Sequence, residues 1–249
     1  MKIEDRIDYI VNWIKDYIKS TNKDSTSLVI GVSGGIDSSV TSTLCAKTGL
    51  KTLVISLPIR QNKQQHSLSL RHAEWLQNNF KNVVSYVIHL DDVFNSFKET
   101  LSEFNSDLAF ANSRSRLRMT TLYQIAQYNN GIVVGTGNKV EDFGIGFYTK
   151  YGDGGVDISP IADCTKTQVW EIGKKLCIIK DIIEAKPTDG LWDDNRSDEE
   201  QIGLTYKEIE AVMNNQDDTN NENYKKFLEI RKPNLHKIKP IPVCKFKDK

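Results

Sequence analysis

The chain begins with hydrophobic residues at helical spacing. They recur every three or four positions, at Ile3, Ile7, Ile10, Val11, Ile14 and Ile18. This spacing predicts an amphipathic helix whose apolar face packs against another part of the protein. The same face could serve the internal core or a contact between two copies of the chain.

Further along, short apolar runs alternate with stretches of helical periodicity. Runs rich in β-branched residues predict strands at 27–32, 52–56, 83–88 and 132–135. Helical spacing predicts helices at 38–47, 64–80 and 116–128. This alternation predicts an α/β fold, a Rossmann-like doubly wound parallel sheet with helices on both faces. Because the crossovers are right-handed, the loops that follow the strands gather at one edge of the sheet, where ligands bind.

The second half of the chain is less regular. Glycines crowd 143–147 and 151–155, which predicts loops, and helical spacing returns at 167–176, 206–214 and 222–231. The acidic stretch 193–200 is either a mobile lid or a solvated loop, and 214–221 is a polar loop between helices. Since no repeat or low-complexity linker interrupts the chain, we expect residues 1–249 to form one domain.

Composition narrows the class of protein. The 249 residues carry 33 Lys and Arg against 33 Asp and Glu, and this zero net charge argues against a protein that coats nucleic acid. With 39% hydrophobic and 27% charged residues, the chain is typical of a globular protein. Its N-terminus lacks the apolar core of a signal peptide, and no stretch could span a bilayer. We therefore expect a cytoplasmic protein with no membrane or nucleic-acid partner.

The cysteines do not form a metal or disulfide pattern. There are four, widely separated and without a CxxC pair, at Cys45, Cys164, Cys177 and Cys244. Neither a zinc site nor a compact disulfide framework has this spacing, so we expect reduced, buried thiols.

The clearest chemical signal follows the first predicted strand, where 31–39 reads GVSGGIDSS. Two adjacent glycines after a strand let the backbone approach a ligand closely, and the N-terminus of the next helix offers free N–H groups to an anion. The serines add hydroxyl donors. Asp37 is placed where its carboxylate could bind a divalent cation that bridges phosphates. A plain tight turn would explain neither the aspartate nor the serines.

This loop matches neither the Walker A pattern nor GxGxxG. It resembles the SGGxDS pyrophosphate loop of the N-type ATP pyrophosphatases, whose fold is described as adenine nucleotide alpha hydrolase-like. Members of that family cleave ATP between the α- and β-phosphates and adenylate an oxygen of a second substrate. The resemblance thus implies the half-reaction but not the acceptor.

Other segments resemble the ammonia-dependent NAD synthetases in order and spacing. The matching stretches are 116–119, 133–141, 146–157, 186–192, 197–206 and 236–237, so the resemblance runs from about residue 27 to residue 237. It implies ATP as co-substrate, Mg²⁺ as cofactor, deamido-NAD and ammonia as substrates, and a homodimer. The apolar residues Leu117, Leu122, Ile125 and Ala126 could contribute to the dimer contact or to the core.

The resemblance also implies roles for individual residues. ATP is expected to contact Gly31, Val32, Ser33, Gly34, Gly35, Ile36, Asp37, Ser38, Thr136, Lys166 and Thr188. Asp37 and Glu141 are the expected Mg²⁺ ligands, and two carboxylates suit that hard cation. Asp37 and Lys166 are the expected catalytic residues, because Lys166 can neutralise charge that develops on the phosphates.

For deamido-NAD, the resemblance implies Arg116, Lys150, Asp157, His236 and Lys237. Positively charged side chains suit a ligand with phosphates and a carboxylate. Arg114 and Arg118 lie four residues apart on one helix face, whereas Arg116 points elsewhere. The remaining histidines, His66, His72 and His89, have no partner pattern, so we expect them to be structural or exposed.

One position departs from the family pattern. Many relatives have an arginine that contributes to ATP binding just before the Leu-Pro that follows the second strand, whereas this chain has Ser56. Arg60, Gln61 or Gln64 could replace it.

The resemblance implies that ATP adenylates the nicotinate carboxylate of deamido-NAD and that ammonia displaces AMP, giving NAD and pyrophosphate. The chain has no room for the amidase domain of glutamine-dependent relatives, so free or separately delivered ammonia is the expected nitrogen donor. Three alternatives remain open: amidation of nicotinate mononucleotide, another ATP pyrophosphatase such as a tRNA-modifying enzyme, and a non-catalytic nucleotide sensor.

Overall fold

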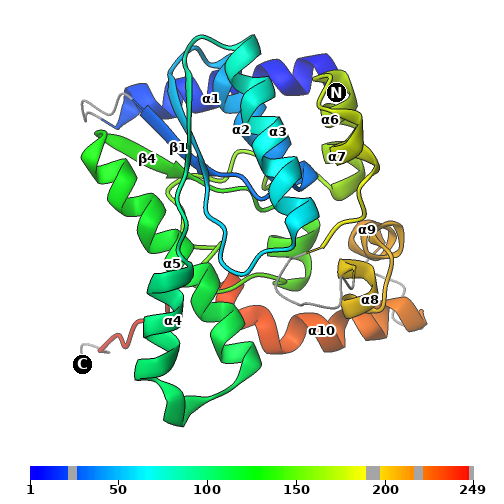
Figure 1. Ribbon diagram of the computed structural model, residues 1–249. Coiled ribbons are helices and arrows are strands. Elements are labelled where there is room, and N and C mark those ends of the chain that lie inside the picture. Colours follow the sequence, from blue (N-terminus) through cyan, green and yellow to red (C-terminus); the bar gives the residue numbers. More distant parts are fainter. Residues whose placement is uncertain (22–26, 189–196, 216–220, 247–249) are drawn as a thin grey trace.

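A parallel sheet of four strands organises the protein (Figure 1). The computed structural model describes residues 1–21, 27–188, 197–215 and 221–246. The strands are β1 (Ser27–Gly31), β2 (Lys51–Ser56), β3 (Val83–Val87) and β4 (Gly131–Val134), in the order β3-β2-β1-β4. A parallel bridge between Val134 and Ile158 continues the sheet beyond β4. The predicted Rossmann-like α/β fold is confirmed.

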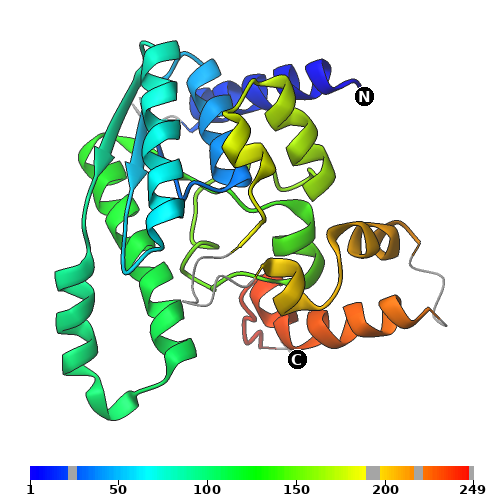
Figure 2. The ribbon, with the colours of Figure 1, turned by 45° about the vertical axis from the view of Figure 1, so that its right-hand side comes forward.

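Helices cover both faces of this sheet, as Figures 1 and 2 show from two directions. Leu28 and Ile30 of β1 pack into one core with five helices: α1 (Ile3–Ser20), α2 (Ile36–Lys47), α3 (Lys63–Asn79), α6 (Lys166–Lys175) and α7 (Lys180–Glu184). Val29 packs into a second core with α4 (Asp91–Thr100) and α5 (Asp107–Tyr128). Alternate residues of a strand point to opposite faces, so a strand with both faces covered is apolar throughout.

The apolar residues considered for a dimer contact serve these internal cores. The stripe of α1 is buried in the first core at Ile7, Ile10, Val11, Ile14 and Ile18. Ala126 of α5 is buried in the second core, and Leu117, Leu122 and Ile125 pack partly buried against it.

A third apolar cluster lies beyond the carboxyl edge of the sheet, where three helices pack together: α8 (Asp198–Ile202), α9 (Tyr206–Asn214) and α10 (Glu222–Ile238). The π-helix η2 (Lys139–Ile145) joins this cluster through Val140 and Ile145. The loops that follow β1 and β4 therefore face the group of helices α8, α9 and α10 (Figure 2).

Several predicted elements differ from the structure. Helix α4 and the 3₁₀ turn η1 (Ser102–Phe104) were not predicted, and α5 begins at Asp107 rather than at residue 116. The π-helix η2 replaces an expected loop, and α10 continues past residue 231 to Ile238 with Pro233 inside it. Residues 198–200 of the acidic stretch begin α8, and 193–196 lie outside the described residues.

Of the four cysteines, all free thiols, Cys45 and Cys164 are buried, whereas Cys177 and Cys244 are exposed. The expectation of buried thiols was thus wrong for two of them. In the described part of the chain, no helix combines the length and the apolar character needed to cross a membrane.

Candidate active site

The glycine-serine loop lies at the carboxyl end of β1 and leads directly into α2. Gly34 has a φ of +90°, and a Cβ at this position would lie 2.4 Å from the backbone oxygen of Gln65, so only glycine fits. The backbone N–H of Ser33 donates to Ser38 Oγ (3.2 Å), and that of Gly35 donates to Ser33 Oγ (3.2 Å). The serine hydroxyls therefore hold the loop in shape while the first turn of α2 presents Asp37.

A second carboxylate comes from the segment after β4. Asn138 is fully buried and caps the π-helix η2, because its Oδ1 accepts from the N–H groups of Val140 and Glu141 (3.0 Å each). Its Nδ2 donates to Asp37 Oδ1 (2.9 Å). One side chain thus orients both Glu141 and Asp37, although they lie far apart in sequence.

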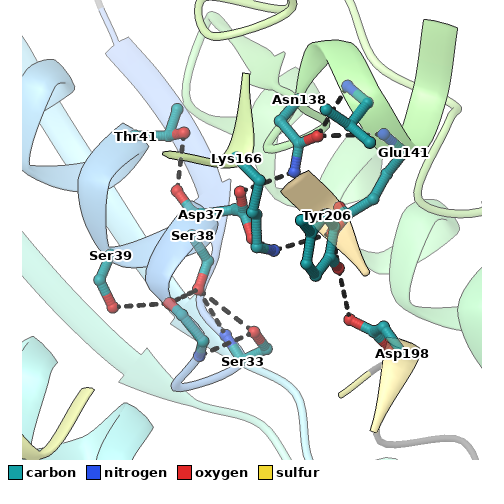
Figure 3. A network of polar contacts seen from close by, with 12 residues as sticks. Ser33, Asp37, Ser38, Ser39, Thr41, Asn138, Glu141, Lys166, Asp198 and Tyr206 are labelled. Carbon is teal, nitrogen blue, oxygen red and sulfur yellow. Dashed lines mark hydrogen bonds and ion pairs between the residues drawn. The ribbon is translucent and has the colours of Figure 1, made fainter. Parts of the chain in front are cut away.

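Lys166 joins these two carboxylates (Figure 3). Its Nζ, carried by the first residue of α6, donates to Asp37 Oδ2 (2.6 Å) and Glu141 Oε1 (2.8 Å). The Lys166 side chain is 2% exposed, against 18% for Asp37 and 15% for Glu141. Lys139, two residues before Glu141, pairs instead with Asp163 (2.8 Å).

Burial and pairing set the charges of this cluster. Burial alone would lower the pKa of Lys166, but the nearby carboxylates of Asp37 and Glu141 outweigh it and raise that pKa above its ordinary value. Burial raises the pKa of Glu141, while the Lys166 ammonium acts in the opposite direction. Lys166 is therefore a permanent cation at neutral pH.

Tyr206 holds Glu141 from the other side. Its buried hydroxyl donates to Glu141 Oε1 and also lies 3.1 Å from Asp198 Oδ2 (Figure 3). Burial raises the pKa of the Tyr206 hydroxyl, and the charges of Glu141 and Asp198 raise it further, so the hydroxyl stays protonated and acts as a donor. Helices α8 and α9 thereby take part in the site.

The residues of the cluster are suited to a divalent cation bound together with phosphates. Asp37, Glu141 and Lys166 together carry one negative charge in excess, and the two carboxylates are hard oxygen donors next to the glycine-serine loop. Mg²⁺ typically binds through one or two carboxylates plus substrate phosphates rather than in an all-protein cage. Accordingly, the described residues contain no group of three or more His, Cys, Asp or Glu side chains that could hold a metal.

Four of the five residues expected to bind the second substrate form a connected group. Arg116 Nε donates to the backbone oxygen of Lys150 (3.2 Å), and Lys150 Nζ donates to that of His236 (3.0 Å). Next to them, Lys237 Nζ donates to the backbone oxygen of Tyr148 (2.7 Å) and lies 5.0 Å from its ring centroid. Burial lowers the pKa of Lys237.

The remaining expected residues lie elsewhere on the edge. Asp157 accepts from the backbone N–H of Val133 (2.7 Å) and from the Tyr123 hydroxyl (3.1 Å), so it is joined to the sheet and α5. Thr136 follows β4 by two residues, at the carboxyl end of the sheet. Thr188 follows α7 and directly precedes the undescribed residues 189–196.

At the position that departs from the family pattern, Ser56 contacts α3. It is buried, and its Oγ lies 3.0 Å from Ser69 Oγ on α3. Of the three suggested replacements, Gln61 reaches the phosphate loop, because its Nε2 donates to the backbone oxygen of Ser33 (3.1 Å). Arg60 instead donates to Asn95 Oδ1 (2.6 Å).

A cavity of about 130 Å³ is lined by Gly135, Gly137, Asp142, Tyr148 and Asp153, among others. Asp142 directly follows Glu141, and Tyr148 accepts from Lys237, so residues beside both groups line it. A Cβ on Gly137 would lie 1.8 Å from Asp142 Oδ2, so the carboxyl of Asp142 packs directly on the glycine backbone. Burial raises the pKa of Asp142 well above its usual range, and the charge of Asp153 raises it further. Asp153 itself is held by Ser115 and by the N–H of Thr149.

Sequence reasoning missed Asn138, Tyr206, Asp142 and Asp153 as members of the site. Asn138 carried a usable signal, because an asparagine just after a strand end is a common helix cap. Tyr206 ends the matching stretch 197–206, but its contact with Glu141 could not be predicted, because it depends on the packing of α9 against η2.

Comparison with known proteins identifies the family of the chain. A sequence profile described as NAD synthase matches residues 6–243. The NH(3)-dependent NAD(+) synthetase of Carboxydothermus hydrogenoformans is 38% identical over 84% of this chain and 85% of its own length. The enzyme of the same name from Mesoplasma florum is 35% identical over 96% of this chain and 93% of its own length.

Two solved structures superpose over nearly the whole chain. The NMN synthetase from Francisella tularensis has a TM-score of 0.89 and 33% identity, covering 99% of this chain and 100% of its own. The NH3-dependent NAD synthetase from Campylobacter jejuni has a TM-score of 0.80 and covers 98% of this chain and 100% of its own. At 23% identity, the second supports the fold alone. Profile, relatives and fold agree over almost the full length, and the chain therefore belongs to the NAD synthase family.

Proposed function

We propose that this protein amidates the nicotinate carboxylate of deamido-NAD, using ATP and ammonia and releasing NAD, AMP and pyrophosphate. The observation that carries the proposal is the position of Lys166, a buried cation fixed between Asp37 of the phosphate loop and Glu141. The family to which the chain belongs and the curated relatives that it matches over most of their length support it.

In this proposal, the chain contributes orientation and charge. The loop 31–38 and the N-terminus of α2 bind the phosphates, and the Lys166 ammonium stabilises negative charge as the carboxylate oxygen attacks the α-phosphorus. The adenylated carboxylate then has AMP as leaving group, and ammonia displaces it. Such a reaction needs little covalent help from protein side chains.

Asp37 and Glu141 are the residues that would hold Mg²⁺. The ion would supply charge neutralisation on the phosphate oxygens, the usual role of Mg²⁺ with nucleotides. Glu141 is held in place by Tyr206 and Asp37 by Asn138, so both carboxylates are oriented before the nucleotide binds.

The group formed by Arg116, Lys150, His236 and Lys237 would bind the pyridine nucleotide. Its cationic side chains suit phosphate and carboxylate oxygens. The cavity lined by Asp142, Tyr148 and Asp153 is where we expect the two substrates to meet, because Tyr148 contacts Lys237 and Asp142 directly follows Glu141.

A second candidate substrate is nicotinate mononucleotide. It is favoured by one specific observation, the 33% identity and TM-score of 0.89 to an NMN synthetase over 99% of the chain. The chemistry is the same, and only the occupied part of the binding site differs.

A product assay tests both candidates. The purified chain is mixed with ATP, Mg²⁺, ammonium and either pyridine substrate, and AMP, pyrophosphate and the amide are measured. A higher kcat/KM for deamido-NAD supports the first candidate, and a higher value for the mononucleotide supports the second. If neither substrate yields AMP and pyrophosphate, the proposed ligase activity is wrong.

The metal ligands are tested in the same assay. Asp37→Ala and Glu141→Ala are expected to abolish pyrophosphate release while circular dichroism shows the fold retained. Glu184→Ala is the matched control, because Glu184 is an exposed carboxylate paired with Lys180. Near-normal activity in either site variant contradicts the metal assignment.

The homodimer also belongs to this proposal. Light scattering coupled to size-exclusion chromatography measures the mass directly. A mass twice the 28.3 kDa of the chain is expected, and a monomer mass at all concentrations contradicts it.

A further inference from the structure

Arg118 is a partly buried cation that the proposed mechanism has not used. It lies on α5, and its Nε donates to the backbone oxygen of Leu57 (2.9 Å), the first residue after β2. The guanidinium therefore lies at the carboxyl edge of the sheet, where the loops after the strands converge.

Arg118 has no ion-pair partner in the described part of the chain. Within residues 1–21, 27–188, 197–215 and 221–246, no carboxylate lies within ion-pair distance of it, and the Leu57 oxygen is the only hydrogen-bond acceptor it reaches. Burial lowers the pKa of Arg118 to about 10, and the like charge of Arg114 adds to this effect, whereas the carboxylates of Asp153 and Asp91, beyond ion-pair distance, partly oppose it. A cation kept in such a place without a partner is costly to the fold, so an anionic ligand would relieve the cost.

The face of α5 that carries Arg118 is turned toward the site. One turn after it, Leu122 lies so close to β1 that a Cβ on Gly31 would be 3.3 Å from Leu122 Cδ1. One turn before it, Ser115 Oγ donates to Asp153 Oδ1 (2.7 Å), and Asp153 lines the cavity. Arg118 therefore lies between the start of the phosphate loop and the cavity wall.

The loop to which Arg118 is bonded also contacts the phosphate loop. Gln61, four residues after Leu57, donates to the backbone oxygen of Ser33. The two terminal nitrogens of the guanidinium have no acceptor among the described residues and remain available.

We propose that Arg118 binds a phosphate oxyanion of a nucleotide substrate through these terminal nitrogens. Planar guanidinium groups match phosphate geometry and bind it with two parallel hydrogen bonds. The inference rests on the proposed function only in taking its ligand to be ATP or the pyridine nucleotide, and both carry such phosphates.

Binding measurements test this inference without requiring turnover. The dissociation constants of ATP and of deamido-NAD are measured separately by calorimetry for the wild-type chain, Arg118→Met and Arg118→Lys. Methionine keeps an unbranched apolar stem without charge, and lysine keeps the charge without the planar fork. Arg71→Met is the control, because it removes an exposed arginine that pairs with Asp181.

We expect Arg118→Met to weaken one of the two nucleotides about ten- to a hundredfold, the size of a charge-assisted hydrogen bond. Arg118→Lys is expected to lose less, and Arg71→Met to bind as the wild type does. The nucleotide whose affinity falls identifies the source of the phosphate. If Arg118→Met does not fold, a threefold or larger loss in Arg118→Lys supports the inference.

Unchanged dissociation constants for both nucleotides in the folded Arg118 variants would overturn it, because the residue would then only hold Leu57. This result is distinct from failure of the proposed function, in which the wild-type chain binds nucleotide but forms no amide.

Discussion

Replacing Lys166 by methionine tests whether the buried cluster is as interdependent as its geometry indicates. The variant keeps an unbranched side chain but leaves the carboxylates of Asp37 and Glu141 facing each other without the cation that lies 2.6 and 2.8 Å from them. Removing one partner of a buried ion pair costs about 3–5 kcal/mol. For a chain of this length, each kcal/mol lowers the melting temperature by about 2–4 °C, so we expect a decrease of about 6–20 °C.

The measurement is calorimetric unfolding of the ligand-free, metal-free protein at several pH values. The loss is expected to be larger at pH 8 than at pH 5. The reason is the raised folded-state pKa of Glu141. Such a carboxyl stabilises the fold below its ordinary pKa of 4.5, and this contribution is lost as the pH rises through the folded-state pKa. Without Lys166 that pKa rises further, so proton uptake at acid pH relieves the variant more than the wild type.

Two comparisons make the prediction specific. Lys175→Met removes a cation whose partner Glu4 is half exposed, and such surface pairs contribute little, so its melting temperature should not change measurably. Adding Glu141→Gln to Lys166→Met removes one of the two unpaired carboxylates and should recover part of the loss. A melting temperature for Lys166→Met within about 2 °C of the wild type at pH 8 would refute the reasoning.

Two further predictions concern the surroundings of the site. Gly34→Ala should lower the free energy of unfolding by at least about 2 kcal/mol and abolish nucleotide binding, because its Cβ would meet backbone atoms. Gly49 also has a positive φ but no atom within 4 Å of a Cβ, so Gly49→Ala should lower the free energy of unfolding by about 1 kcal/mol. Equal losses in urea unfolding of the two variants would contradict this. Burial lowers the pKa of His72 from 6.5 to about 4, so the stability it contributes is present above pH 6.5 and is lost, up to about 3 kcal/mol, as the pH falls toward 4. His72→Gln should therefore flatten the pH profile of the melting temperature over this range, and an unchanged profile would count against the assignment.

The strands were predictable because their residue types are distinctive. All four carry β-branched or apolar runs, and every predicted strand end lies within one residue of the end in the structure. Helix α4 was missed because it has only ten residues, although Phe94 and Phe97 recur at helical spacing and pack in the second core. The π-helix η2 was not predicted, because Gly144 near its end and Gly146 just after it are typical of a loop, whereas Val140 and Ile145 pack it against α9 and α10.

The site was predictable in its residue types but not in its contacts. The loop motif singled out Asp37, and the family resemblance singled out Glu141 and Lys166. No periodicity could show that Lys166 is 2% exposed and bonded to both carboxylates, since that depends on how α6 packs beside α2. His72 was expected to be structural or exposed, and it is fully buried beside Ser42.

Asn138 limits how this site can be engineered. Its amide nitrogen serves the loop after β1 and its amide oxygen serves the helix after β4, so the carboxamide has only one workable orientation. An aspartate would keep the cap but place a third negative charge against Asp37, and a leucine would satisfy neither end. Transplanting residues 31–38 onto another parallel sheet would therefore transfer a turn without its chemistry, because the smallest portable unit spans both strand ends and the asparagine that joins them.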